Sequence, residues 1–219
     1  MEDRPSVLTP AIDPALVMSD SDLFWEEHWK KFVVGLVALV VLILAVGAWM
    51  FWSARTLSSA EALYSLSADA AAWREVVRQY PGTVPAGNAQ LRLAELLRVG
   101  GDLDGAAAEL ETFLKSQPEH PLAGPAWLTL GEVRQLQAKN ESALEAYRTA
   151  SSRYTTSYAA PLALLAEARL LSTIDRTGEA RAVLESVPTL YQDSPAAMVA
   201  AAELSRLAPA ASPAPVPGN

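Results

Sequence analysis

A run of 21 residues without a charged or strongly polar side chain limits what this chain can fold into more than any other feature. The run extends from Phe32 to Trp52 and reads FVVGLVALVVLILAVGAWMFW. A helix of this length spans about 31 Å, which matches the hydrocarbon thickness of a bilayer. We therefore expect one transmembrane helix over residues 32–52, after a short acidic cytoplasmic tail over residues 1–31.

The alternative to an uncleaved anchor is a secretory signal, whose apolar region is shorter and follows a basic start. Residues 1–31 instead carry seven acids and three bases, which favours the anchor. Lys30 and Lys31 precede the apolar run and only Arg55 follows it closely. The positive-inside rule then places the N-terminus in the cytoplasm and the C-terminal part on the opposite side of the membrane. The opposite orientation stays open, because the bias is one residue.

Small residues recur with a period of 37 after the apolar run. Ala106, Ala143 and Ala180 follow this spacing, and a large apolar residue follows each of them four residues later. Such a period is typical of helical hairpins stacked into an α-solenoid. An upstream block of the form Leu, small residue, Glu begins at Leu93, Leu130 and Leu165. Because the last two blocks are 35 residues apart, we expect the loop at 172–177 to be two residues longer than its counterparts.

The fold class expected is all-α, with a single N-terminal transmembrane helix followed by a tetratricopeptide-repeat-like α-solenoid. Residues 53–85 are expected to form a connecting helix and a partial repeat, since neither Pro nor Gly interrupts 53–80. The helical domain covers 86–207, and 208–219 is a Pro-rich segment expected to be disordered. The helices of the domain are expected near 86–99, 103–116, 122–138, 141–154, 158–173, 177–191 and 195–207.

Two kinds of side chain are expected to pack between the repeats. Small residues permit helices to approach closely, and large apolar residues fill the grooves between hairpins. The residues expected in these packing positions are Leu93, Ala94, Ala106, Leu110, Trp127, Leu130, Gly131, Ala143, Tyr147, Ala150, Leu165, Ala166, Ala180 and Leu184.

The sequence offers no catalytic constellation, and we expect neither a cofactor nor a bound metal. It contains no cysteine and only two histidines, His28 and His120, which are too far apart in sequence for a local metal motif. We interpret both histidines as solvated. The formal net charge of −8 also argues against nucleic-acid binding, which needs clustered Lys and Arg.

Some residues admit both a binding and a packing interpretation. Glu95, Glu132 and Glu167 could form a ladder of carboxylates for a basic peptide, but we favour solvated side chains or pairs with neighbours such as Arg98. Trp73 and Trp127 could line an aromatic pocket, although both occupy positions typical of a core. The residues selected as possible partner contacts are Arg92, Trp127, Arg134 and Arg169.

The segment Trp127-x-x-Leu130-Gly131, followed by Ala143, Tyr147 and Ala150, resembles the tetratricopeptide repeat signature. Arg134 and Thr155 stand where that signature usually has an aromatic residue and a proline. With its acidic tail and single anchor, the whole chain is similar to the bacterial ancillary subunit family of the SecYEG translocon. That resemblance implies an inner-membrane protein facing the periplasm, whose partners are the channel, periplasmic chaperones or emerging polypeptides.

Two functions follow as hypotheses, and neither is enzymatic. The first is a membrane-tethered periplasmic protein–protein interaction module, ancillary to the Sec machinery, which presents a concave surface to its partners. The alternative is a scaffold for cell-envelope assembly or cell division that uses the same repeats and the Pro-rich segment.

Overall fold

The computed structural model describes residues 20–66 and 69–207, with side chains from His28 onward. The tail before Asp20 and the Pro-rich segment after Leu207 lie outside this part, and so do the expectations made for them. All regular structure in the described part is helical. Close contacts divide the chain into two units, 1–55 and 56–219, which are considered separately.

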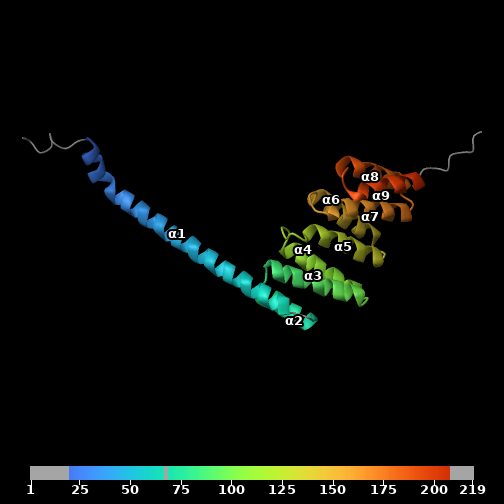
Figure 1. Ribbon diagram of the computed structural model, residues 1–219, viewed down its shortest axis with the longest axis horizontal. Helices are drawn as coiled ribbons and strands as arrows, with labels where there is room; N and C mark the ends of the chain where they lie inside the picture. Colours follow the sequence, from blue (N-terminus) through green and yellow to red (C-terminus); the bar gives the residue numbers. More distant parts are fainter. Residues whose placement is uncertain (1–19, 67–68, 208–219) are drawn as a thin grey trace, which may run out of the picture. The chain divides into compact units, whose positions relative to one another are not determined.

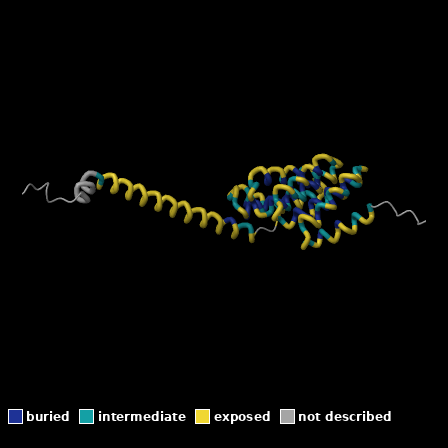
Figure 2. Tube along the Cα trace, turned by 90° about the horizontal axis from the view of Figure 1, so that it is seen from above, coloured by how far each residue is buried: buried dark blue, intermediate teal, exposed yellow. Residues whose placement is uncertain are grey.

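Helix α1 (Asp20–Leu66) contains the apolar run. Its part up to Arg55 belongs to the first unit. Every residue from Trp29 to Arg55 is exposed, as the yellow colour along this helix shows (Figure 2). The stretch His28–Leu66 is long and apolar enough to cross a membrane. Large exposed apolar side chains are stable when lipid surrounds them, which is the environment that the sequence predicts for residues 32–52.

The second unit contains the end of α1 and a series of shorter helices (Figure 1). Each of these helices packs on the next one, and α5 also contacts α7, which contacts α9. They are α2 (Ala70–Gln79), α3 (Val84–Val99), α4 (Leu103–Ser116), α5 (Ala123–Leu136), α6 (Asn140–Arg153), α7 (Ala159–Thr173), α8 (Thr177–Leu190) and α9 (Pro195–Leu207). The predicted helices from 86 onward agree with these bounds to about two residues, and the α-solenoid is confirmed.

The turns inside the three hairpins are equivalent. Gly101, Ala138 and Asp175 lie 37 residues apart and have positive φ angles of 84°, 58° and 62°. The period therefore runs through the third hairpin without an insertion, and the prediction of a longer loop there is wrong. The residue of α7 that matches Ala94 and Gly131 is Ala168, two positions after the residue that the sequence block indicates.

The predicted continuous helix over 53–80 is also wrong, because α1 ends at Leu66 and α2 begins at Ala70. Asp69 has an extended backbone, with φ −137° and ψ 171°, and its carboxylate accepts a hydrogen bond of 2.8 Å from the Ala72 N–H. An aspartate that caps a free N–H group in this way favours a new helix start over helix continuation. Leu63, in the last turns of α1, packs beside Val76 of α2.

The core lies between successive hairpins, as the dark blue segments inside the stack show (Figure 2). Of the residues expected to pack there, all are buried except Trp127 and Ala166, which are half-buried. Trp127 packs against two neighbouring core clusters, one built around Phe113 and the other around Tyr147. Its ring therefore links adjacent hairpins.

Candidate interaction surface

The first helices of the successive hairpins expose equivalent positions. Glu95 of α3, Glu132 of α5, Arg169 of α7 and Arg206 of α9 lie 37 residues apart, and all four are exposed. Because α5 contacts α7 and α7 contacts α9, these positions follow one another along a row of helices. We call the exposed side of α3, α5, α7 and α9 the first-helix face.

The α3 and α5 part of this face carries a small charge network. Both guanidinium nitrogens Nε and Nη2 of Arg98 donate hydrogen bonds of 2.7 Å to the carboxylate of Glu95. These bonds hold the pKa of Glu95 below its ordinary value. Burial raises the pKa of Glu132, and the charge of Arg98 only partly offsets this effect. Glu132 is thus a carboxylate that its surroundings partly desolvate, on a surface open to a partner.

The three arginines selected from the sequence have different environments. Arg92 is exposed on the first-helix face. Arg169 is also exposed, but it donates hydrogen bonds of 2.8 and 2.6 Å to the carboxylate of Glu203 on α9. Arg92 and Arg169 therefore both lie on the first-helix face.

Arg134 serves a different purpose from the one expected. Its side chain is 18% exposed, donates to the Gln137 amide oxygen at 2.9 Å and pairs with the Glu111 carboxylate of α4. Both acceptors already occupy the guanidinium, so Arg134 joins α5 to the preceding helix. The sequence could not reveal this role, because Glu111 is 23 residues away in the chain.

Glu167 does not belong to a ladder with Glu95 and Glu132. In the 37-residue register it follows Leu93 and Leu130, which are buried, and it is itself only 4% exposed. Its carboxylate accepts a hydrogen bond of 2.6 Å from Nε of Arg148 on α6. The interpretation of three carboxylates in register is therefore corrected: Glu167 is a charged residue at a leucine position, held by an ion pair.

His120 is buried, at 8% exposure, and the expectation of a solvated side chain is wrong. Its Nε2 lies 3.2 Å from the Val84 carbonyl oxygen, and its Nδ1 accepts a 3.0 Å hydrogen bond from the Leu122 N–H. The ring meets Phe113 edge to face at 5.0 Å between centroids. His120 thereby joins the start of α3 to the segment before α5, across one repeat.

Serines replace this histidine at the next two junctions. Ser157 and Ser194 follow His120 at intervals of 37, and their Oγ atoms accept hydrogen bonds of 3.2 Å from Ala159 N–H and 3.3 Å from Ala196 N–H. Each acceptor satisfies a donor at a helix start that would otherwise lack a partner. His120 thus accepts a hydrogen bond from the N–H two residues later, as the two serines do, but through a larger side chain.

Sequence reasoning also missed a row of tyrosines at the junctions. The Tyr154 hydroxyl donates to the Pro118 carbonyl at 3.0 Å, and the Tyr191 hydroxyl donates to the Thr155 carbonyl at 3.3 Å. These bonds join each junction to the preceding one. The signal was present in the 37-residue spacing of Tyr154 and Tyr191; Tyr80 lies two periods before Tyr154, with Gln117 at the position between them.

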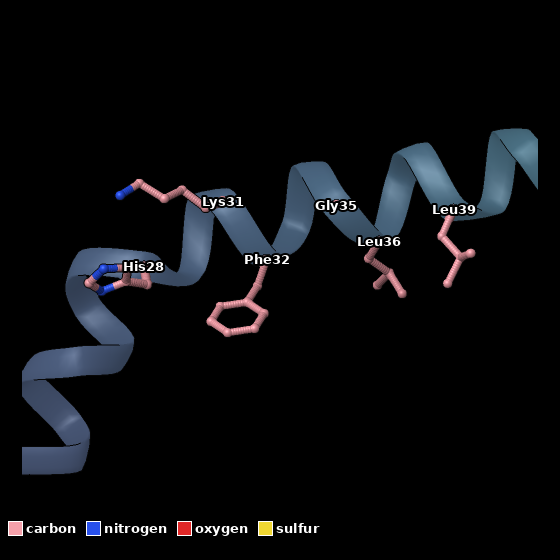
Figure 3. A pocket seen from close by; sticks show the side chains of 6 residues that line it. All are labelled: His28, Lys31, Phe32, Gly35, Leu36 and Leu39. Atoms are coloured by element: carbon pink, nitrogen blue, oxygen red, sulfur yellow. The ribbon is translucent and has the colours of Figure 1, made fainter.

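A hollow on α1 is lined by His28, Lys31, Phe32, Gly35, Leu36 and Leu39 (Figure 3). All six residues come from one helix, and Phe32, Leu36 and Leu39 point to the same side in this view. The hollow arises because Gly35 has no side chain, and a Cβ there would meet nothing within 4 Å. It is a notch in one helix surface and not an enclosed cavity. Within residues 28–66 and 69–207, whose side chains the structure describes, no three His, Asp or Glu side chains are grouped to hold a metal.

A family model described as a tetratricopeptide repeat-like domain matches residues 23–159, which is more than half of the chain. The match begins inside α1 and therefore includes the apolar run, α2 and the first two complete hairpins. No curated protein matches the chain significantly.

Proposed function

Because this chain belongs to the tetratricopeptide repeat-like domain family, we propose that it is a membrane-tethered protein–protein interaction module, ancillary to the Sec translocation machinery. Repeat arrays of this kind are typically non-catalytic and bind proteins through the extended surface that stacked hairpins create. The finer assignment to the translocon rests on the resemblance of the anchor and repeats to its ancillary subunit family.

The main support for this proposal is the exposure of charged residues on the first-helix face. It offers exposed charged groups at Arg92, Glu132 and Arg169 on three successive hairpins, and core packing holds the helices beneath them. Such an arrangement suits an extended polypeptide or a partner's surface loop, which contacts several repeats at once. A membrane tether raises the effective concentration of a weak module beside a membrane partner.

The proposed topology has the N-terminus in the cytoplasm of a bacterium and the helical unit in the periplasm. Lys30 and Lys31 lie just before the apolar run, and Arg55 follows it. Protease added to intact spheroplasts should then degrade the helical unit. A helical unit that stays protected until the membrane is lysed would contradict this orientation.

Photocrosslinking in living cells tests the function and the surface together. A crosslinking amino acid is placed at Arg92, Glu132 or Arg169, and at Glu145 as a control on the exposed side of α6. We expect adducts with channel subunits or periplasmic chaperones from the first three positions and few from Glu145. Adducts with proteins of wall synthesis or division would instead support the scaffold alternative, and equal adducts from Glu145 would reject the first-helix face.

A further inference from the structure

The 37-residue register continues beyond α8 and makes α9 the first helix of a fourth hairpin. Ser194 lies just before α9 as Ser157 lies just before α7, and each accepts a hydrogen bond from the N–H two residues later. The described chain ends at Leu207, with α9. Within that part, no second helix completes the fourth hairpin (Figure 1).

Among the described residues, nothing covers one side of α9. In the second hairpin, Gly131 is buried and a Cβ there would collide with Tyr147 of the second helix, whereas Ser205 at the matching position is exposed. Pro161 is buried in α7, whereas Met198 at the matching position of α9 is 74% exposed. We call Met198, Ala201, Ala202 and Ser205, which are all exposed, the open α9 face.

A helix is the element that fits this face, because helices cover the matching side of α3, α5 and α7. A second copy of the chain provides one, since its own α9 carries the same uncovered surface.

Side-chain size sets the direction in which two α9 helices would pair. Met198 is the large residue of the open α9 face and lies towards its N-terminal end. Ala201, Ala202 and Ser205 follow towards the C-terminal end. An antiparallel pair places the methionine of each copy against the small residues of the other, which is the self-complementarity of a two-fold contact.

Charge favours the same direction. Asp193 precedes α9 and Arg206 lies in its last turn, both are exposed, and neither forms an ion pair within the described residues. In an antiparallel pair, Asp193 of each copy lies near Arg206 of the other at both ends of the contact. In a parallel pair, like charges would meet.

We propose that the open α9 face is a homodimer contact, in which α9 helices of two copies pair antiparallel. The contact goes beyond the partner binding proposed above and does not depend on it. One pair of helices of this length, about 20 Å, buries less than a standard stable interface. The dimer is therefore weak and exchanges readily, so the experiment traps it covalently.

The natural chain contains no cysteine, so an introduced cysteine is the only thiol that can form a disulfide. Ala201→Cys places a thiol near the middle of the open α9 face, and Ala108→Cys places one on the exposed side of α4 as a matched control. Both full-length variants are oxidised in detergent at the same concentration. We expect roughly tenfold more disulfide-linked dimer from Ala201→Cys than from Ala108→Cys.

Charge reversal tests the pairing direction in the Ala201→Cys background. Asp193→Arg alone and Arg206→Asp alone should each lower the dimer yield, because like charges then meet. The double reversal should restore it. Both positions are exposed, and thermal melting checks that each variant remains folded.

Two outcomes would overturn the proposal. If Ala201→Cys forms no more dimer than Ala108→Cys and reacts fully with a maleimide, the face is open and unpaired. If it forms no dimer and resists maleimide, another segment of the same chain covers it. Loss of dimer with translocon crosslinks intact would leave the proposed function untouched.

Discussion

Gly131 of α5 and Tyr147 of α6 pack so closely that a methyl group on Gly131 would clash with the Cδ1–Cε1 edge of the tyrosine ring. Tyr147 is 1% exposed and donates a 2.9 Å hydrogen bond to the Gln135 amide oxygen, so its ring cannot easily move away. The contact fixes the distance between the two helices of the second hairpin. It explains why a glycine is present inside a helix, where glycine is otherwise unfavourable.

Gly131→Ala should therefore destabilise the protein by about 1–3 kcal/mol, through overpacking against Tyr147. Gly178→Ala is the matched control, because a Cβ there meets nothing within 4 Å and the residue lies in the first turn of α8. It should be neutral or stabilise by up to about 1 kcal/mol. Urea unfolding of the full chain in detergent, followed by tryptophan fluorescence, measures both. Equal effects of the two substitutions would contradict this account.

Gly87 and His120 should be energetically coupled. A Cβ on Gly87 would lie 2.8 Å from the imidazole, whereas the next two junctions hold a serine in place of the histidine. Gly87→Ala should cost about 1–3 kcal/mol in the natural chain. In the His120→Ser background, where the imidazole is gone, the same change should cost less, and the remaining cost comes from Phe113 Cε2, 2.9 Å from the added Cβ. A double-mutant cycle measures the coupling, and strictly additive effects would show that the two residues do not constrain each other.

From residue 86 onward the sequence was sufficient for the helices but not for the exact register of the third hairpin. Periodic small residues such as Ala106 and Ala143 indicate closely packed helices, because only small side chains permit close helix approach. The block at Leu165 misled because Leu164, Leu165 and Ala168 are all buried, and an apolar helix offers several matches to a short pattern. The equivalent turns at Ala138 and Asp175 resolve the register, and backbone angles are not visible in a sequence.

The side chains that the sequence placed wrongly are those that a distant part of the chain covers. Arg92 was correctly placed on an exposed helix position, whereas Arg134 and His120 find partners 23 and 36 residues away. Such contacts depend on how hairpins stack. His120 lies between two prolines in the sequence, which suggests an exposed loop. It is buried because the start of α3 lies beside it.

Glu167→Leu restores the leucine found at Leu93 and Leu130, and should leave stability unchanged or raise it by about 1–2 kcal/mol. The reason is that burying the carboxylate costs solvation, while Arg148 is 49% exposed and keeps water contact without its partner. Arg148→Leu should instead destabilise by about 1–3 kcal/mol, because it leaves Glu167 buried and unpaired. Urea unfolding distinguishes the two. Strong destabilisation by Glu167→Leu would mean that the ion pair contributes more than the leucine does.

Gly101 and Ala138 occupy equivalent turn positions with positive φ angles, so substitutions at the two positions can be compared. Ala138 has a φ of 58°, a conformation that costs an alanine roughly 1 kcal/mol and a glycine almost nothing. Ala138→Gly should therefore stabilise slightly, whereas Gly101→Ala, at φ 84°, should destabilise by about 1 kcal/mol. Thermal melting of the two variants checks the opposite signs. A shift of the same sign in both would indicate that contacts other than backbone strain dominate at these turns.

Tyr147 should make the protein sensitive to alkaline pH. Burial raises the pKa of its hydroxyl well above the ordinary value, with a smaller contribution from Glu132. Below about pH 10 the hydroxyl is protonated in both the folded and the unfolded protein, so its ionisation does not lower the free energy of unfolding. Above that pH the unfolded chain ionises while the folded one does not, so the free energy of unfolding falls by about 1.4 kcal/mol per pH unit.

Tyr147→Phe removes this alkaline loss. Near pH 8 the variant should be less stable by about 1 kcal/mol, because the hydrogen bond to Gln135 is absent. Above pH 10 its stability should fall less steeply than that of the natural chain, and the two curves should converge. Tyr158→Phe is the control, since Tyr158 is 69% exposed and should leave the pH profile unchanged. Parallel profiles for the natural chain and Tyr147→Phe would show that Tyr147 ionises as readily in the folded protein as in the unfolded one.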